Sequence, residues 1–155
     1  MDRRPYLGHG VTMMLYTIGY QGQAQAALID SLKAVGVEVL VDVRAIAASR
    51  RAGFSKTLLA GSLAEAGIDY VHLRGVGTPR AGREAARDGR TQELREIYAG
   101  HMAEPAFQLD FERLRELVGT RRAAILCYCE TAAKCHRRIL SDRLAEEDGV
   151  EVVDL

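Results

Sequence analysis

The feature that most constrains the fold is a repeated alternation of β-favouring runs with helical patterns. Short runs of apolar and β-branched residues predict strands at 15–18, 37–43, 68–73, 123–129 and 150–153. Apolar residues at helical spacing predict helices at 28–35, 55–66, 106–118 and 132–147, with further helical stretches at 83–87 and 92–102. Right-handed crossovers join such elements into a Rossmann-like, three-layer α/β domain, an open sheet of about five mainly parallel strands with helices on both faces.

Length and composition fit one folded domain. The chain has 155 residues, of which 48% are hydrophobic and 27% charged, and this is typical of a globular protein that buries one core. Residues 1–13 lack an apolar period and are expected to form a loose leader, with residues 14–155 as the single α/β domain. No run reaches the roughly 20 apolar residues of a membrane helix, and the leader lacks the pattern of a signal peptide. We therefore expect a cytoplasmic protein with no membrane partner, and no oligomeric state is predicted.

Arginines are concentrated in the middle third of the chain. The net charge is zero, but residues 44–90 hold nine basic and four acidic side chains. Arginine suits bidentate binding of phosphate or carboxylate, and the carboxyl ends of parallel strands share the edge where α/β sheets bind ligands. A codon bias towards arginine accounts for its excess over lysine but not for its clustering. The sequence predicts an Arg-rich anion pocket at this edge, with these candidate ligands: Arg44, Arg50, Arg74, Arg80 and Arg137.

Three residues at this edge are candidates for catalysis: Asp42, Cys135 and His136. Asp42 and Arg44 are two residues apart at a strand end, so their side chains lean towards one face and can pair. Either Asp42 orients Arg44 as an anion clamp or polarises a hydroxyl, or the pair anchors a loop. Cys135 and His136 begin the last helix, where the helix N-terminus and Arg137 favour a thiolate nucleophile. The alternative is that both side chains pack inward as core residues.

Other polar motifs give weaker signals. His72 lies among apolar residues of a predicted strand, which is typical of a core histidine, and His9 and His101 receive no assignment. Four zinc-compatible side chains follow one another near the end of the fourth strand: Cys127, Cys129, Cys135 and His136. Their spacing matches no standard zinc knuckle, so no metal is expected, and the odd number of cysteines indicates thiols rather than a disulfide framework. The segment 75–77 (GVG) lacks the spacing of a dinucleotide or P-loop motif, and no cofactor is expected.

Four motifs in order resemble the domain of unknown function 488 family. They are TIGY after the first strand, DVR at the second with SRRAGF beyond it, YVHLRGVG at the third, and Cys127 followed eight positions later by Cys135-His136-Arg137. The match spans about residues 14–155. The family is bacterial and archaeal, α/β in fold and without an established reaction. The resemblance therefore implies the fold and the positions of the site, but no activity.

The chain departs from the commonest family pattern in two loops. Family members usually have TIGH followed by Ser, where this chain has Gly19, Tyr20 and Gln21. The usual Cys-x-Glu after the fourth strand is Cys-Tyr-Cys here, with Glu130 one place later. The residues of these two loops that are expected to support the site are Gly19, Tyr20, Cys129 and Glu130.

The sequence thus favours a pocket for a phosphorylated small molecule, a nucleotide or a nucleic-acid end, with hydrolase or transferase chemistry as an open question. The alternative is a non-catalytic nucleic-acid-binding or regulatory module that uses residues 44–90 as a phosphate-contacting patch. Aromatic residues make up only 6% of the chain, and this disfavours binding of single strands by base stacking. A third possibility is a thiol or metal sensor built on the three cysteines.

Overall fold

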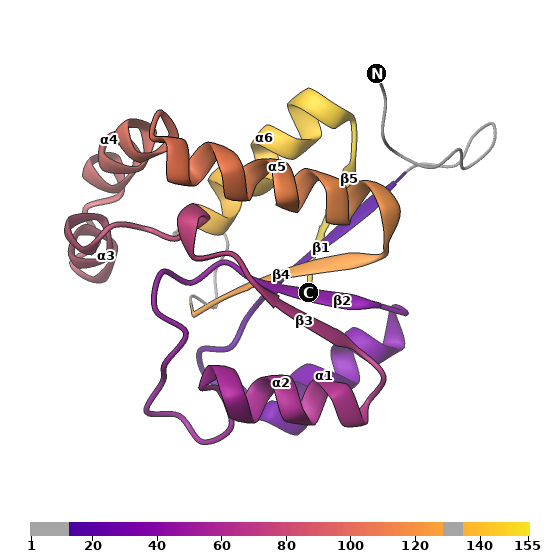
Figure 1. The fold of residues 1–155 in the computed structure, drawn as a ribbon. Helices are drawn as coiled ribbons and strands as arrows, with labels where there is room; N and C mark the ends of the chain where they lie inside the picture. The colour runs from indigo at the N-terminus through magenta and orange to yellow at the C-terminus, as the bar shows by residue number, and fades with distance from the viewer. Residues whose placement is uncertain (1–12, 129–134) are drawn as a thin grey trace.

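One parallel sheet organises the chain in the computed structural model, which describes residues 13–128 and 135–155 (Figure 1). Its strands are β1 (Met14–Gly19), β2 (Val39–Asp42), β3 (Asp69–His72), β4 (Ala123–Cys127) and β5 (Glu151–Asp154). The helices are α1 (Gln25–Ala34), α2 (Lys56–Glu65), α3 (Arg80–Arg87), α4 (Thr91–Met102), α5 (Pro105–Thr120) and α6 (His136–Asp148), with a 3₁₀ turn η1 (Arg74–Val76). All four strand pairs are parallel, which confirms the predicted α/β fold.

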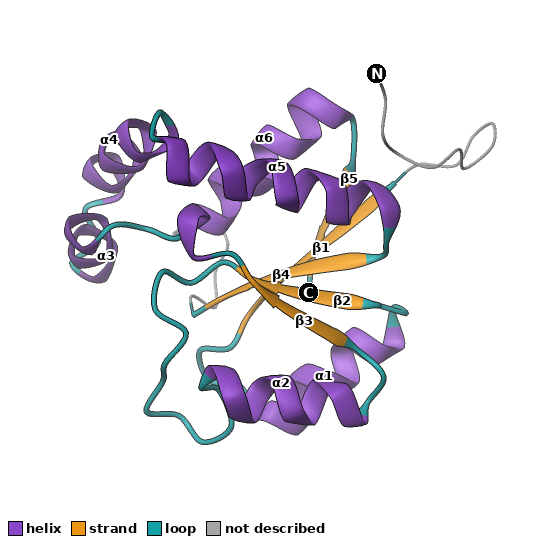
Figure 2. Ribbon diagram, in the orientation of Figure 1, coloured by secondary structure: helices purple, strands orange, loops and turns teal. Residues whose placement is uncertain are grey.

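The strand order is β3-β2-β4-β1-β5, so the chain reverses its direction across the sheet after β3. The first two crossovers carry α1 and α2 over one face, and the return crossovers carry α5 and α6 over the other (Figure 2). This division follows from the right-handed rule, because a crossover that runs in the opposite direction must cover the opposite face. Because the strands are parallel, the carboxyl ends of β2, β3 and β4 open onto one edge of the sheet. The loop after β2 leads to one face, and the loops after β3 and β4 lead to the other.

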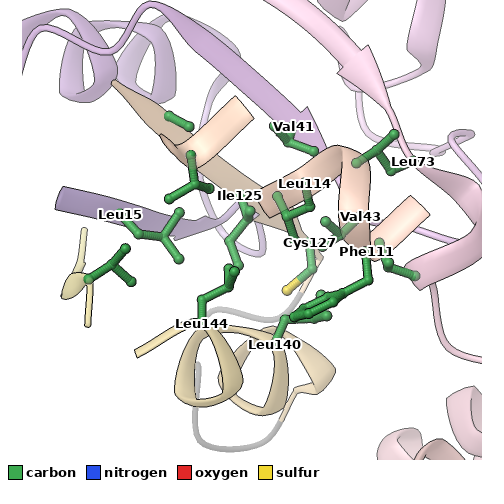
Figure 3. Packing of buried hydrophobic residues seen from close by; sticks show 14 of the residues in the cluster. Leu15, Val41, Val43, Leu73, Phe111, Leu114, Ile125, Cys127, Leu140 and Leu144 are labelled. Atoms are coloured by element: carbon green, nitrogen blue, oxygen red, sulfur yellow. The ribbon is translucent and has the colours of Figure 1, made fainter. Parts of the chain in front are cut away.

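Two apolar cores lie on either side of the sheet. Along β4, Ile125 and Cys127 pack with α5 and α6, whereas Ala124 and Leu126 pack with α1 and α2. Figure 3 shows the first core, where Leu140 of α6 faces the strand side chains. Because β4 is buried on both faces, its sequence is a continuous apolar run instead of an alternating one, as parallel sheets require.

The segment 75–82, which lies between the predicted strand at 68–73 and the predicted helical stretch at 83–87, holds most of η1 and the first turn of α3. Its glycines are needed for close packing. A Cβ on Gly77 would lie 2.3 Å from the backbone nitrogen of Ala45, and one on Gly75 would lie 2.4 Å from the carbonyl oxygen of Ala106. The Gly75 N–H donates to Asp110 at 2.7 Å. The segment therefore docks η1 against α5 and against the loop that follows β2.

Three expected segments fall partly outside the described residues, and one of them is the predicted strand at 123–129, whose last position is not described. The last helix begins at His136, and residues 132–134 of its predicted range are not among those described, as is also true of residues 1–12 of the predicted leader. Of the helices in the described part of the chain, none has the length and apolarity needed to cross a lipid bilayer.

Candidate functional site

A cleft of about 840 Å³ opens at the carboxyl edge of the sheet, between the loop after β2 and the segment that leads into α3. This volume is within the ordinary range for small-molecule sites. Backbone segments 45–48 and 77–79 form two of its walls. Six charged or titratable side chains line the rest: Lys56, His72, Arg74, Arg83, His101 and Glu104.

The cleft carries an excess of positive charge. Its described lining residues include three Lys or Arg side chains and one carboxylate, which belongs to the exposed Glu104 at the α4–α5 junction. Within the described ranges, neither Lys56 nor Arg74 is in an ion pair, and both side chains are exposed. Arg83 donates from Nη1 to the Thr78 carbonyl oxygen at 2.8 Å, which holds its guanidinium against the cleft wall. The cationic groups are thus available to an anion that enters the cleft.

Two helices begin at the cleft. Lys56 is the first residue of α2, and Pro79 is the N-cap of α3, and both residues line the cavity. The N-terminus of a helix carries partial positive charge on its free N–H groups, so both helix dipoles reinforce the cationic side chains.

Each of the two cleft histidines is fixed by a backbone carbonyl. His72 Nε2 lies 2.7 Å from the Arg44 carbonyl oxygen, and His101 Nε2 lies 2.7 Å from the Gly75 carbonyl oxygen. A carbonyl only accepts hydrogen bonds, so both Nε2 atoms carry the proton and donate it. In the neutral rings Nδ1 is then the acceptor. His101 Nδ1 lies 3.6 Å from Glu104 Oε2.

Sequence reasoning missed most of this lining. His72 was expected to be a core residue, but it is only half-buried and lines the cleft. Its position as the last residue of β3 was a usable signal, because the carboxyl edge of a parallel sheet is where ligands bind. Lys56 and His101 carried no such signal, since α2 and α4 reach the cleft only through the tertiary fold.

Asp42 and Arg44 form a buried ion pair beside the cleft and do not line it. Arg44 Nε and Nη2 donate to the two Asp42 carboxylate oxygens at 2.8 and 2.6 Å. Arg44 Nη1 donates to the Tyr20 hydroxyl at 3.2 Å and to the Phe54 carbonyl oxygen at 2.8 Å. Asp42 also accepts hydrogen bonds from the Arg44 backbone N–H and from the Tyr70 hydroxyl. The Arg44 side chain is 6% exposed, and the Asp42 side chain is 0% exposed.

This geometry favours the loop-anchoring alternative. Burial by itself lowers the pKa of Arg44, but the hydrogen bonds and charge of Asp42 outweigh it and raise that pKa. Burial raises the pKa of the Tyr70 hydroxyl, and its hydrogen bond to Asp42 raises it further. Each Asp42 oxygen already accepts two hydrogen bonds. The pair therefore ties the end of β2 to the loop at Phe54 and presents no guanidinium face to the cleft.

Cys135 belongs to the core on the α5–α6 face, and the buried His136 packs against Tyr98 of that core with ring centroids 5.5 Å apart. Cys135 Sγ is 2.8 Å from Cys127 Sγ and 3.4 Å from His136 Nδ1. His136 Nε2 is 2.8 Å from the Val43 carbonyl oxygen, and this contact ties the start of α6 to the end of β2. Both residues are thus at the carboxyl edge, as predicted, but behind the wall of the cleft and buried.

The remaining candidate residues are dispersed. Of the five arginines proposed as anion ligands, Arg74 alone is among the cleft-lining residues. Arg50 and Arg80 are exposed, and Arg80 lies 3.3 Å from Glu84, whereas Arg137 is buried in the first turn of α6. The fifth, Arg44, is in the ion pair described above.

The supporting residues divide in the same way. Gly19 ends β1, and the buried Tyr20 ring stacks on Phe54 with ring centroids 4.5 Å apart. Cys129 and Glu130 lie outside the described residues. Over residues 13–128 and 135–155, no three His, Cys, Asp or Glu side chains are grouped closely enough to hold a metal ion.

Comparison with known proteins identifies a family and no closer relative. The model of the family described as "Domain of unknown function DUF488" matches residues 24–144. No curated protein and no solved structure matches the chain. The matched range runs from the residue before α1 to the last apolar turn of α6, so it contains every residue that lines the cleft.

Proposed function

Because the chain belongs to the DUF488 family of domains of unknown function, a family for which no reaction is established, we propose a function from the geometry of the cleft. In this proposal the cleft binds a phosphorylated small molecule or a nucleotide. The observation that carries this proposal is the meeting of Lys56, Arg74 and Arg83 in one cavity of small-molecule size. Lys56 and Arg74 are exposed and have no carboxylate partner in the described part of the chain.

Phosphate fits this chemistry better than a carboxylate does. A phosphate group offers several acceptor oxygens and up to two negative charges, which match an arginine fork, a lysine and two helix N-termini together. A monocarboxylate would leave part of this positive charge unneutralised. The donor set supports a phosphoryl group as the anchoring part of the ligand.

A pocket is favoured over a patch that contacts nucleic acid. Lys56, Arg74 and Arg83 line one cleft, whereas Arg50 and Arg80 are not among its lining residues. Among the described residues that line the cavity, none is a Phe, Tyr or Trp on which a base could stack. A nucleotide ligand would therefore be held mainly through its phosphate.

A second candidate function, hydrolysis or transfer at the bound phosphate ester, rests on His72. Its Nε2–H donates to the Arg44 carbonyl oxygen, so Nδ1 of the neutral ring is left as the proton acceptor inside the cleft. A positioned histidine of this kind can serve as a general base towards water or a hydroxyl group.

Calorimetric titration with inorganic phosphate, pyrophosphate and nucleoside monophosphates tests the proposal. We expect one-to-one saturation, and an affinity about 10- to 100-fold lower for Arg74→Ala, because a charge-assisted hydrogen bond contributes roughly 1.5–3 kcal/mol. Arg121→Ala is the matched control, because Arg121 precedes β4 at the opposite edge of the sheet and forms an ion pair with the exposed Asp69. An affinity that falls equally in both variants would argue against the cleft.

Titration with duplex DNA over a range of salt concentrations separates the nucleic-acid alternative. A phosphate-contacting patch would bind DNA with a slope of about 0.9 per phosphate contact in a plot of log affinity against log salt. Such binding without any response to small phosphates would make the nucleic-acid module the better function. His72→Gln tests the catalytic candidate: it should abolish ester hydrolysis while the affinity for phosphate changes little.

A further inference from the structure

Two cysteines and a histidine form a chemically ordered chain of contacts behind the cleft wall. The sulfur atoms of Cys127 and Cys135 are 2.8 Å apart, and Cys135 Sγ is 3.4 Å from His136 Nδ1. His136 Nε2 lies 2.8 Å from the Val43 carbonyl oxygen. The residues come from the end of β4, the N-cap of α6 and its first helical position. None of them belongs to the cleft for which a function is proposed above.

The Val43 carbonyl oxygen, at the end of this series of contacts, determines the tautomer of the neutral His136 ring. Because the Val43 oxygen can only accept, His136 Nε2 carries a proton, and Nδ1 of the neutral ring is an acceptor. In this tautomer the Cys135 thiol is placed to donate to Nδ1, and the Cys127 thiol is placed to donate to the Cys135 sulfur. Proton transfer to Nδ1 gives a Cys135 thiolate next to an imidazolium ring and a thiol donor. The positive end of α6, whose N-cap is Cys135, favours the same anion.

We propose that Cys135 and Cys127 are a redox-active dithiol that reduces a hydroperoxide and closes into an intramolecular disulfide. Cys135 is the attacking thiol, because its sulfur is the one in contact with His136. Cys127 is the resolving thiol, because its sulfur touches Cys135. The side chains are 1% and 6% exposed for Cys127 and Cys135, and this favours an oxidant as small as hydrogen peroxide over a bulky disulfide.

The reaction balances in two steps. The Cys135 thiolate attacks one peroxide oxygen and forms an S–O bond, the O–O bond breaks, and the leaving hydroxide takes the proton held by His136 to give water. The Cys127 sulfur then attacks the sulfenic sulfur of Cys135, the S–O bond breaks, and the hydroxyl group leaves as a second water with the Cys127 proton. Two thiols lose two electrons and one peroxide gains them, so the products are one disulfide and two waters.

Treatment of the reduced protein with one equivalent of hydrogen peroxide, followed by peptide mapping under non-reducing conditions, tests this proposal. We expect a Cys127–Cys135 disulfide that dithiothreitol reverses, with a mass two hydrogens lower than that of the reduced chain. Cys135→Ser should lose the reaction. Cys127→Ala should stop at a Cys135 sulfenic acid that dimedone traps, and far-UV circular dichroism of both variants shows whether the fold is retained.

The third cysteine supplies the matched control. Cys129→Ser, at a position outside the described residues, should still form the Cys127–Cys135 bond. His136→Gln, which keeps polarity and loses the proton acceptor next to Cys135, should react with peroxide at least tenfold more slowly while the mapped bond stays the same. A disulfide through Cys129, a bond between two chains, or oxidation of the wild type to sulfinic acid without a disulfide would each overturn the proposal.

Discussion

At the scale of single residues, the ion pair of Asp42 and Arg44 is buried and extensively hydrogen-bonded. The carboxylate accepts four hydrogen bonds, and the guanidinium donates four to protein acceptors in a nearly water-free site. A buried charge of this kind is tolerated because its partner is present, and it becomes costly once that partner is removed. The pair thus fixes the loop that forms one wall of the cleft.

We predict that Arg44→Ala lowers the free energy of unfolding by about 3–5 kcal/mol, because it leaves the Asp42 carboxylate buried without its countercharge. Urea denaturation monitored by circular dichroism measures this loss. Arg50→Ala removes the same charge from an exposed position nearby and should change stability by no more than about 0.5 kcal/mol. Equal effects of the two substitutions would mean that the ion pair contributes nothing beyond surface charge.

The Tyr70 hydroxyl makes the free energy of unfolding depend on pH in the alkaline range. Its pKa is raised in the folded protein by burial and by the bond to Asp42, whereas the unfolded value stays near 10. A raised folded pKa gives stability that is complete below pH 10 and is lost as pH rises from there towards the folded pKa. We expect the free energy of unfolding to fall more gently above pH 10 in Tyr70→Phe than in the wild type. Identical slopes in urea titrations at pH 9, 10 and 11 would contradict this assignment.

At the scale of elements, the contact between η1 and the loop after β2 depends on a missing side chain. A Cβ on Gly77 would lie 2.3 Å from the Ala45 nitrogen and 2.4 Å from its Cα, and neither backbone atom can move aside cheaply. The conformation of Gly77 is one that any residue adopts, so space and not backbone strain excludes alanine there.

We predict that Gly77→Ala costs at least about 2 kcal/mol of stability through overpacking and widens the cleft that Gly77 lines. Gly61→Ala is the matched control. Gly61 lies inside α2, and a Cβ added there would meet nothing within 4 Å, so alanine should stabilise the helix by roughly 0.5–1 kcal/mol. Thermal unfolding of both variants provides the comparison, and a neutral Gly77→Ala would show that the two loops are not in tight contact.

Most elements could be predicted from periodicity because their burial is regular. The continuous apolar run at 123–127 and the stripe through Leu28 and Leu32 are decided by which face each residue turns to the sheet. The start of α3 could not be predicted, because Arg80 to Arg87 has no apolar period and only Gly82 and Ala85 are buried. Its helical form depends on packing against α4, which a local pattern does not record.

In the candidate site, too, some features follow from the local sequence and others depend on the tertiary fold. The edge of the sheet and the presence of Arg74 in the site followed from strand ends alone, since every carboxyl end of a parallel sheet opens onto the same side. Charge alone did not distinguish Arg74, which faces the cleft, from Arg44, which is enclosed by Asp42, Tyr20 and Phe54. The loop after β2 lines the cleft through residues 45–48, so the difference lies in the tertiary contacts of each side chain and not in the position of its loop.

At the scale of the whole molecule, one sheet serves two cores, and every strand between its edges contributes to both. Leu63 of α2 packs in one core and Leu114 of α5 in the other, and both are fully buried. Because β2, β4 and β1 are shared, damage to one core weakens the support of the other. The described chain should therefore unfold as one cooperative unit.

We predict that Leu63→Ala and Leu114→Ala each lower the free energy of unfolding by about 2–5 kcal/mol and each leave a single transition. The two residues belong to different cores on opposite faces of the sheet, so the double variant should show the sum of both losses to within about 0.5 kcal/mol. Circular dichroism and tyrosine fluorescence should report the same midpoint. Separate midpoints in either single variant would mean that the two layers unfold independently.

Because β4 lies between β2 and β1, the sheet can be completed only late in the synthesis of the chain. β1 pairs only with β4 and β5, and β2 pairs only with β3 and β4, so within the described strands no hydrogen bond joins β1 to β2. During synthesis, β1, β2 and β3 leave the ribosome well before β4. Until Ala123–Cys127 emerges, β1 is not hydrogen-bonded to the β2–β3 pair. The nascent chain must hold its first two helices and three strands without a finished sheet, and it closes late, when a single five-residue strand is inserted between them.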